Sequence, residues 1–158
     1  MTPKIKTNWQ LYTSDQEISF SGMRSWVEEN NSLTNRLRLL EAKIDLKVLD
    51  EQICKHHDAH TSAVPVLGNL RKILLQSDQN LIFAESFFSQ DVIKEFAKFG
   101  RLEEEPLGKY LFSDSNIKKH ETYIADYELD DQTFLGRKCI YSYNDQKFSV
   151  IEVFLFNE

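Results

Sequence analysis

Two charged residues, Arg71 and Glu152, lie in segments of sequence that are rich in apolar side chains. Arg71 lies within residues 70–75, and Glu152 lies within residues 150–155. Charged side chains are rarely buried unless they are paired or functional. An arginine can bind a carboxylate through two parallel hydrogen bonds, and a glutamate can accept a hydrogen bond or a proton. Taken alone, Arg71 is better explained as a surface arginine on a strand, and Glu152 could equally be an outward-facing side chain on a half-exposed strand.

A second group of candidate ligands lies close together in one short segment: Cys54, His56, His57, Asp58 and His60. These side chains are all zinc ligands, but the segment has neither HExxH nor CxxC spacing. We therefore favour a solvated loop over residues 55–62, with a zinc site as the competing hypothesis. The two cysteines of the chain, Cys54 and Cys139, are expected to be reduced thiols.

Composition limits the class of protein. A length of 158 residues with 41% hydrophobic positions fits one domain over residues 1–158. The net charge of -6 argues against general nucleic-acid binding, so an anionic ligand would have to meet a few local cations. No apolar run approaches the roughly 20 residues that span a bilayer, and the first ten residues lack the apolar core of a signal peptide. We expect a cytoplasmic monomer without membrane insertion or nucleic-acid partners.

Six segments have the pattern of β-strands. Residues 42–48 alternate between apolar and charged side chains, although a helix is also compatible with this composition. The others are rich in Ile, Val, Phe and Tyr and cover residues 70–77, 81–88, 122–129, 135–143 and 147–156. Polar residues at 77–80 and 144–146 predict two hairpins, and therefore antiparallel pairing.

Helical patterns surround these strands. Residues 23–29 and 33–40 predict two short helices, the second with Ser32 as its N-cap. Residues 89–100, with Ser89 as a possible N-cap, predict an amphipathic helix that ends at Gly100. Another short helix is expected to begin at Pro106, just after three glutamates at 103–105, where negative charge suits a helix N-terminus. The pattern predicts an α+β domain in which helices flank an antiparallel sheet.

Four segments resemble the chorismate lyase family. Residues 106–112 read Pro-Leu-Gly-Lys-Tyr-Leu-Phe and resemble its PLGxYLF signature. Residues 69–75 are similar to its L-R-x-I-L-L strand, residues 150–155 to its terminal x-E-x-F-L strand, and residues 32–36 to its S-M-T-x-R segment. Their order and spacing are also similar, so the resemblance extends from about residue 32 to residue 156.

The resemblance implies a six-stranded antiparallel sheet with helical flaps over a buried ligand cavity. It also implies conversion of chorismate to 4-hydroxybenzoate and pyruvate, the first committed step of ubiquinone biosynthesis, without a metal or organic cofactor. By this resemblance Arg71 holds the ring carboxylate, Glu152 is catalytic, and Leu107 and Leu33 contact the ligand, with Leu33 in place of a methionine. The alternative function is a non-catalytic domain of the same fold that binds or senses a small aromatic acid.

The chain departs from the family at one pair of residues. Where the family has Gly-Arg, an ungapped comparison from Arg71 places Glu85 and Ser86, so one cation is lost and one acid is added. An acid near a dianionic ligand should repel it. Four cations could compensate, and the sequence does not select among them: Lys72, Lys109, Arg137 and Lys138. Of these, Arg137 belongs to a Gly-Arg pair that the family shares, and we interpret it as structural.

One basic stretch also contains acidic residues. Arg36, Arg38, Lys43 and Lys47 alternate with acidic residues, which is typical of a mixed, solvated surface.

Overall fold

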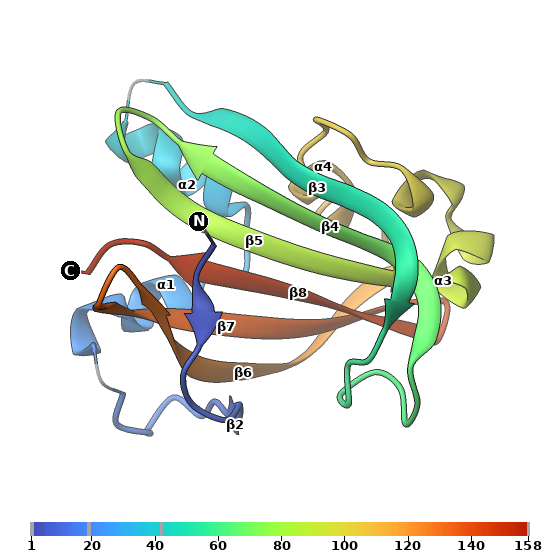
Figure 1. The fold of residues 1–158 in the computed structure, drawn as a ribbon, viewed down its shortest axis with the longest axis horizontal. Coiled ribbons are helices and arrows are strands. Elements are labelled where there is room, and N and C mark those ends of the chain that lie inside the picture. Colours follow the sequence, from blue (N-terminus) through green and yellow to red (C-terminus); the bar gives the residue numbers. More distant parts are fainter. Residues whose placement is uncertain (1, 19, 42, 158) are drawn as a thin grey trace.

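The computed structural model describes residues 2–18, 20–41 and 43–157, and its main element is a curled antiparallel sheet (Figure 1). Six long strands follow the order β6-β7-β8-β5-β4-β3 across this sheet. Two strands of two residues each, β1 and β2, both pair with β6. The strands are β1 (Lys4–Ile5), β2 (Gln10–Leu11), β3 (Asp45–His56), β4 (Val66–Gln76), β5 (Asn80–Ser89), β6 (Ile117–Leu129), β7 (Gln132–Tyr143) and β8 (Gln146–Phe154).

The six predicted strand segments each overlap one of the long strands, but the described residues form eight strands rather than six. The two additional strands are too short to show a periodic pattern in sequence. Ala42, where the first predicted strand begins, lies outside the described residues. Its counterpart β3 continues to His56, inside the segment expected to be a loop, because it pairs with β4 along its whole length.

Tight turns join three pairs of consecutive strands: β4–β5, β6–β7 and β7–β8. Both predicted hairpins, β4–β5 and β7–β8, are confirmed as antiparallel pairs. In the β7–β8 turn Asn144 and Asp145 have φ values of 47° and 72°, and in the β6–β7 turn Asp130 and Asp131 have values of 51° and 64°. Asn and Asp tolerate this left-handed region, and two such residues in a row give the turn that matches the twist of paired strands.

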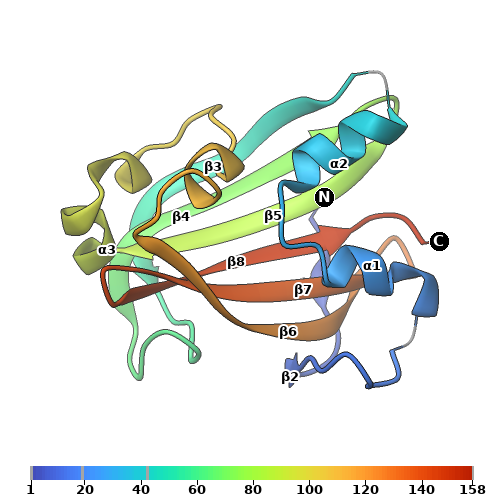
Figure 2. The same ribbon diagram turned by 180° about the vertical axis from the view of Figure 1, so that it is seen from behind.

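The helices gather on one side of the sheet. Figure 2 shows α1, α2 and α4 over this face and α3 at one end of the sheet. None of the helices in the described part of the chain is long and apolar enough to cross a membrane. The helical segments are the 3-10 helix η1 (Ser21–Met23), α1 (Arg24–Val27), α2 (Leu33–Leu40), α3 (Gln90–Glu95), the 3-10 helix η2 (Ala97–Gly100) and α4 (Gly108–Leu111).

Local capping starts two of these helices as predicted. Ser32 accepts a hydrogen bond from the backbone of Asn35 at 3.2 Å, and Ser89 caps α3 in the same way. The prediction of one continuous helix over residues 89–100 is wrong, because Phe96 has an extended backbone (φ -143°, ψ 94°). This break lets the Phe96 ring pack edge-on against Phe99, with centroids 4.6 Å apart.

Apolar side chains pack on both faces of the sheet. The helix-covered face carries two clusters, one around Trp26 and the other around Phe99. On the opposite face, called the outer face here, a smaller cluster includes Tyr127, whose ring lies 5.9 Å from that of Trp9 in the N-terminal segment. The space between the two clusters of the helix-covered face is a pocket.

Candidate functional site

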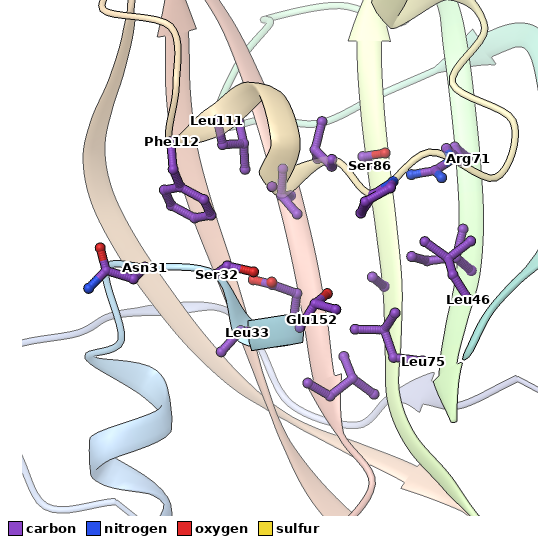
Figure 3. A pocket seen from close by; sticks show the side chains of 18 of the residues that line it. Asn31, Ser32, Leu33, Leu46, Arg71, Leu75, Ser86, Leu111, Phe112 and Glu152 are labelled. Atoms are coloured by element: carbon purple, nitrogen blue, oxygen red, sulfur yellow. The ribbon is translucent and has the colours of Figure 1, made fainter. Parts of the chain in front are cut away.

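The pocket lies under the helices, with strands as its floor and the start of α2, parts of α4 and the residues that flank α4 as its roof (Figure 3). Side chains along a strand alternate between faces, so every second residue of a strand reaches the pocket. The central part of the floor consists of Arg71, Ile73 and Leu75 from β4 and Ile82, Ala84 and Ser86 from β5. Apolar walls with a few polar groups are typical of sites for small molecules.

Arg71 is one of two buried arginines that line this pocket, with only 2% of its surface exposed. One guanidinium nitrogen, Nη2, donates hydrogen bonds to the carbonyl oxygens of Glu103 at 2.8 Å and Glu105 at 2.7 Å. The Nε atom is buried and has no hydrogen-bond partner among the described residues. Burial lowers the pKa of Arg71, while the carboxylates of Glu51 and Glu105 oppose this effect. A buried guanidinium with a free donor is suited to bind an anion.

Glu51 supports Arg71 from the neighbouring strand β3, where the two residues are paired in register. Its carboxylate accepts hydrogen bonds from the backbone of Leu102 at 2.8 Å, the backbone of Glu103 at 2.9 Å and the amide of Asn69 at 2.9 Å. Although burial raises it, the pKa of Glu51 is lowered overall by these hydrogen bonds. Glu51 and Arg71 therefore hold the loop that leads into α4 over the pocket.

Glu152 enters the pocket from β8 and is paired with Arg137 of β7. The Oε1 atom of Glu152 accepts a hydrogen bond from Arg137 Nε at 2.9 Å. Arg137 Nη1 also donates to the carbonyl oxygens of Trp26 at 2.9 Å, Val27 at 3.1 Å and Glu29 at 2.9 Å. Although burial lowers it, the pKa of Arg137 is raised overall by the Glu152 carboxylate. The pair fixes the orientation of Glu152 and connects the end of α1 to the sheet.

Arg71 and Glu152 approach the pocket from strands that are separated by β5. Arg71 pairs with Ser86 of β5, whereas Glu152 pairs with Ala84. Two strand spacings of about 4.8 Å and a two-residue offset of about 6.8 Å place their Cα atoms about 12 Å apart. Both side chains face the space between them (Figure 3). The space between them therefore has a cation at one end and a carboxylate, which can accept a hydrogen bond, at the other.

Comparison with known proteins agrees with this arrangement. The family model "Chorismate lyase" matches residues 5–158. The chain belongs to the chorismate lyase family. Three similar proteins are each named "Probable chorismate pyruvate-lyase". The one from Pseudoalteromonas translucida is 27% identical over 96% of this chain and 93% of its own length. Those from Pseudoalteromonas atlantica and Psychromonas ingrahamii are 26% and 24% identical, over 84% and 82% of this chain and 79% and 80% of their own.

Within this chorismate lyase family member, the pocket brings together all four residues to which the resemblance assigns a role. Arg71 and Glu152 lie on the floor, Leu33 is buried at the start of α2, and Leu107 lies just before α4. The roles themselves stay predictions.

The departure from the family pattern affects the pocket at one residue only. Ser86 lines the pocket, whereas its neighbour Glu85 points to the outer face, where its carboxylate lies 3.9 Å from Lys72 Nζ. The expectation that Glu85 would repel an anion in the pocket is therefore wrong, because successive residues of a strand face opposite sides of the sheet. The family's second cation is nevertheless missing where Ser86 stands.

The structure separates the four cations that could compensate. Lys72 and Lys138 extend from the outer face, where each pairs with a carboxylate. Lys109 pairs with Glu105 at 3.5 Å and does not line the pocket. Arg137 does line it, but its charge is compensated by its carboxylate partner, and its contacts agree with a structural role.

The segment over residues 55–62 is only in part the solvated loop that the sequence predicts, because Lys55, His57 and Ala59 are exposed but Asp58 is buried. Asp58 is 6% exposed and accepts a hydrogen bond from Lys138 Nζ at 3.0 Å. The ring of His60 lies 4.0 Å from that of Tyr123. These partners are distant in sequence, so local composition could not reveal them. Among the residues that the structure describes, no group of three or more His, Cys, Asp or Glu side chains is placed to hold a metal ion.

Sequence reasoning missed two polar residues near the pocket. Tyr141 lines it and is 5% exposed, and burial raises its pKa. Its spacing of four residues from Arg137 on one strand was the available signal, since both must face the same side. Glu51 offered no such signal, because the irregularity between Val48 and Asp50 changes the alternation along β3.

Proposed function

We propose that this chain is a chorismate pyruvate-lyase that converts chorismate to 4-hydroxybenzoate and pyruvate without a metal or organic cofactor. The observation that carries the proposal is the placement of Arg71 and Glu152 across one largely apolar pocket in a member of the chorismate lyase family. The names of the three relatives support it. The proposal extends to a cytoplasmic monomer that supplies 4-hydroxybenzoate for ubiquinone biosynthesis, as its first committed step.

Chorismate has groups that match both ends of the pocket. Its ring carboxylate binds the guanidinium of Arg71, and its C4 hydroxyl, on the opposite ring carbon, donates a hydrogen bond to Glu152. Leu33 and Leu107 pack against the ring and exclude water, which strengthens both polar contacts. The ring is thereby held in one orientation before the reaction starts.

The reaction is an elimination driven by aromatisation. The bond between C3 and the enolpyruvyl oxygen breaks, with its electron pair going to that oxygen, while the C4 hydrogen leaves as a proton. The ring becomes 4-hydroxybenzoate, and the enolpyruvate takes up one proton at its methylene carbon to give pyruvate. Glu152 assists the proton transfer or orients the C4 hydroxyl, and Arg137 holds the carboxylate in place through its hydrogen bond.

A coupled assay of the purified protein, treated with chelator, tests the proposal. Equal amounts of pyruvate and 4-hydroxybenzoate formed from chorismate are expected. The variants Arg71→Ala and Glu152→Ala test the roles: the first should lose affinity for 4-hydroxybenzoate, and the second should lose turnover. Full turnover by the Glu152 variant would contradict its role, and normal product binding by the Arg71 variant would place the anchor elsewhere.

A second candidate function is binding or sensing of a small aromatic acid without catalysis. Ser86, in place of the family's arginine, favours it because the pocket has lost one cation. It predicts measurable calorimetric binding of 4-hydroxybenzoate together with no release of pyruvate from chorismate. The combined assay and titration therefore separate the two functions.

A further inference from the structure

The proposed substrate is a dianion, yet of the two arginines that line the pocket in the described part of the chain, only Arg71 is not in an ion pair. Arg71 can meet the ring carboxylate, but Arg137 is already paired with Glu152. Ser86 stands where the family pattern has an arginine, so the pocket floor supplies no further positive charge. The second carboxylate, on the enolpyruvyl arm, therefore needs a cation from beyond the pocket lining.

The pocket opens into a surface hollow between α2 and α4, called the rim hollow here. The rim hollow and the pocket share Asn31, Ser32, Thr34, Pro106, Gly108 and Phe112. The rim hollow adds two cations, Arg38 and Lys109. The two roof elements lie close together here, since a Cβ atom on Gly108 would be 3.5 Å from Ser32 Oγ. A group that extends from the pocket through this opening would enter the hollow that these two cations line.

We propose that Arg38, in the last turn of α2, binds the enolpyruvyl carboxylate of chorismate. This inference rests on the proposed function and assigns a role to a residue outside the segments that resemble the family. Lys109 is the weaker candidate, because its ammonium lies 3.5 Å from the Glu105 carboxylate. The ion pairs of the described residues include Arg36 and Lys43 but not Arg38. A guanidinium also presents the planar pair of donors that suits a carboxylate.

The shape of the substrate agrees with this position. With the ring carboxylate at Arg71 and the C4 hydroxyl at Glu152, the arm leaves from C3, to one side of the line between the two residues. Figure 3 shows Asn31 and Phe112 at the side of the pocket away from Arg71, and Phe112 is 43% exposed. The chain has a net charge of -6, which repels a dianion at a distance. A cation at this opening would provide a local attraction.

The test compares Arg38→Gln with Lys47→Gln. Lys47 is exposed and follows Leu46, which lines the pocket, so the control removes one positive charge from the outer face of β3. Arg38→Gln should raise the KM for chorismate about three- to tenfold with little change in kcat, as expected for a solvent-accessible charged hydrogen bond. Arg38→Glu should raise it further, and Arg38→Lys should restore part of the affinity. The effect should shrink at high salt.

The product supplies the decisive comparison, because 4-hydroxybenzoate lacks the second carboxylate. Its Kd should be the same for the wild type and Arg38→Gln, whereas a general distortion of the roof would weaken both ligands. An unchanged KM, or equal losses for chorismate and 4-hydroxybenzoate, would overturn the inference. If the wild type releases no pyruvate, the proposed function fails separately. In that case, calorimetric titration with chorismate tests the inference. It is overturned if Arg38→Gln does not bind chorismate more weakly than the wild type while binding 4-hydroxybenzoate equally well.

Discussion

Glu152 is expected to contribute both to the stability of the fold, through its ion pair with Arg137, and to the reaction. The two contributions can be measured separately. Arg137 is 2% exposed, and Glu152 is its charged partner at 2.9 Å. Removing one partner of a buried ion pair typically costs about 3–5 kcal/mol. Glu152→Gln keeps an oxygen acceptor, and three carbonyls still accept hydrogen bonds from Arg137. We therefore expect a loss of about 2 kcal/mol of unfolding free energy for Glu152→Gln and about 3 kcal/mol for Glu152→Ala.

Urea unfolding followed by tryptophan fluorescence measures this loss. With an m value of about 2 kcal/mol/M, the midpoint for Glu152→Gln should fall by about 1 M. In an Arg137→Met background, Glu152→Gln should lower the free energy of unfolding much less, because no buried charge is then left without a partner. A midpoint equal to that of the wild type would refute the reasoning, and so would equal losses in both backgrounds.

Activity gives the second half of this prediction. At temperatures where Glu152→Gln stays folded, kcat for pyruvate release should fall by about 100-fold or more, because an amide cannot accept a proton. Arg137→Met should lose activity as well, since the carboxylate would no longer be held in place. Full turnover by Glu152→Gln would show that hydrogen bonding, rather than proton transfer, is its contribution.

Three further predictions concern the sheet and the roof. Gly68→Ala should lower the free energy of unfolding by about 3 kcal/mol, because its Cβ would lie 2.3 Å from the Phe88 carbonyl oxygen; an unchanged thermal melt would contradict this. Burial raises the pKa of Asp58, but hydrogen bonds and Lys138 lower it overall. The contribution of Asp58 to the free energy of unfolding is therefore complete above about pH 4, near the pKa of Asp in the unfolded chain, and is lost as the pH falls through the pKa of the folded protein. Asp58→Asn should therefore make the free energy of unfolding less dependent on pH below about pH 4. A pH dependence equal to that of the wild type would contradict this prediction. Glu51→Gln should accelerate hydrogen exchange at the backbone amides of Leu102 and Glu103, which donate hydrogen bonds to Glu51, and should raise the KM for chorismate. Exchange rates equal to those of the wild type would mean that other contacts hold the roof.

Local sequence was sufficient for much of the fold. Alternation along residues 70–77 and 81–88 and the polar residues between them depend only on neighbouring positions, and this hairpin was predicted correctly. The caps Ser32 and Ser89 are also local features. The helix predicted over residues 89–100 failed at Phe96, where packing with distant aromatic rings such as Tyr110 outweighs helical preference.

The sequence by itself determined the family and the two charged residues, Arg71 and Glu152, that face the pocket, because both follow from residue type and spacing along the chain. Only the tertiary structure decided which face each neighbouring side chain occupies. It placed Glu85 on the outer face, Glu51 beside Arg71 and Arg38 at the rim hollow. These positions depend on strand register, on an irregularity in β3 and on contacts between segments far apart in the chain. No local pattern contains that information.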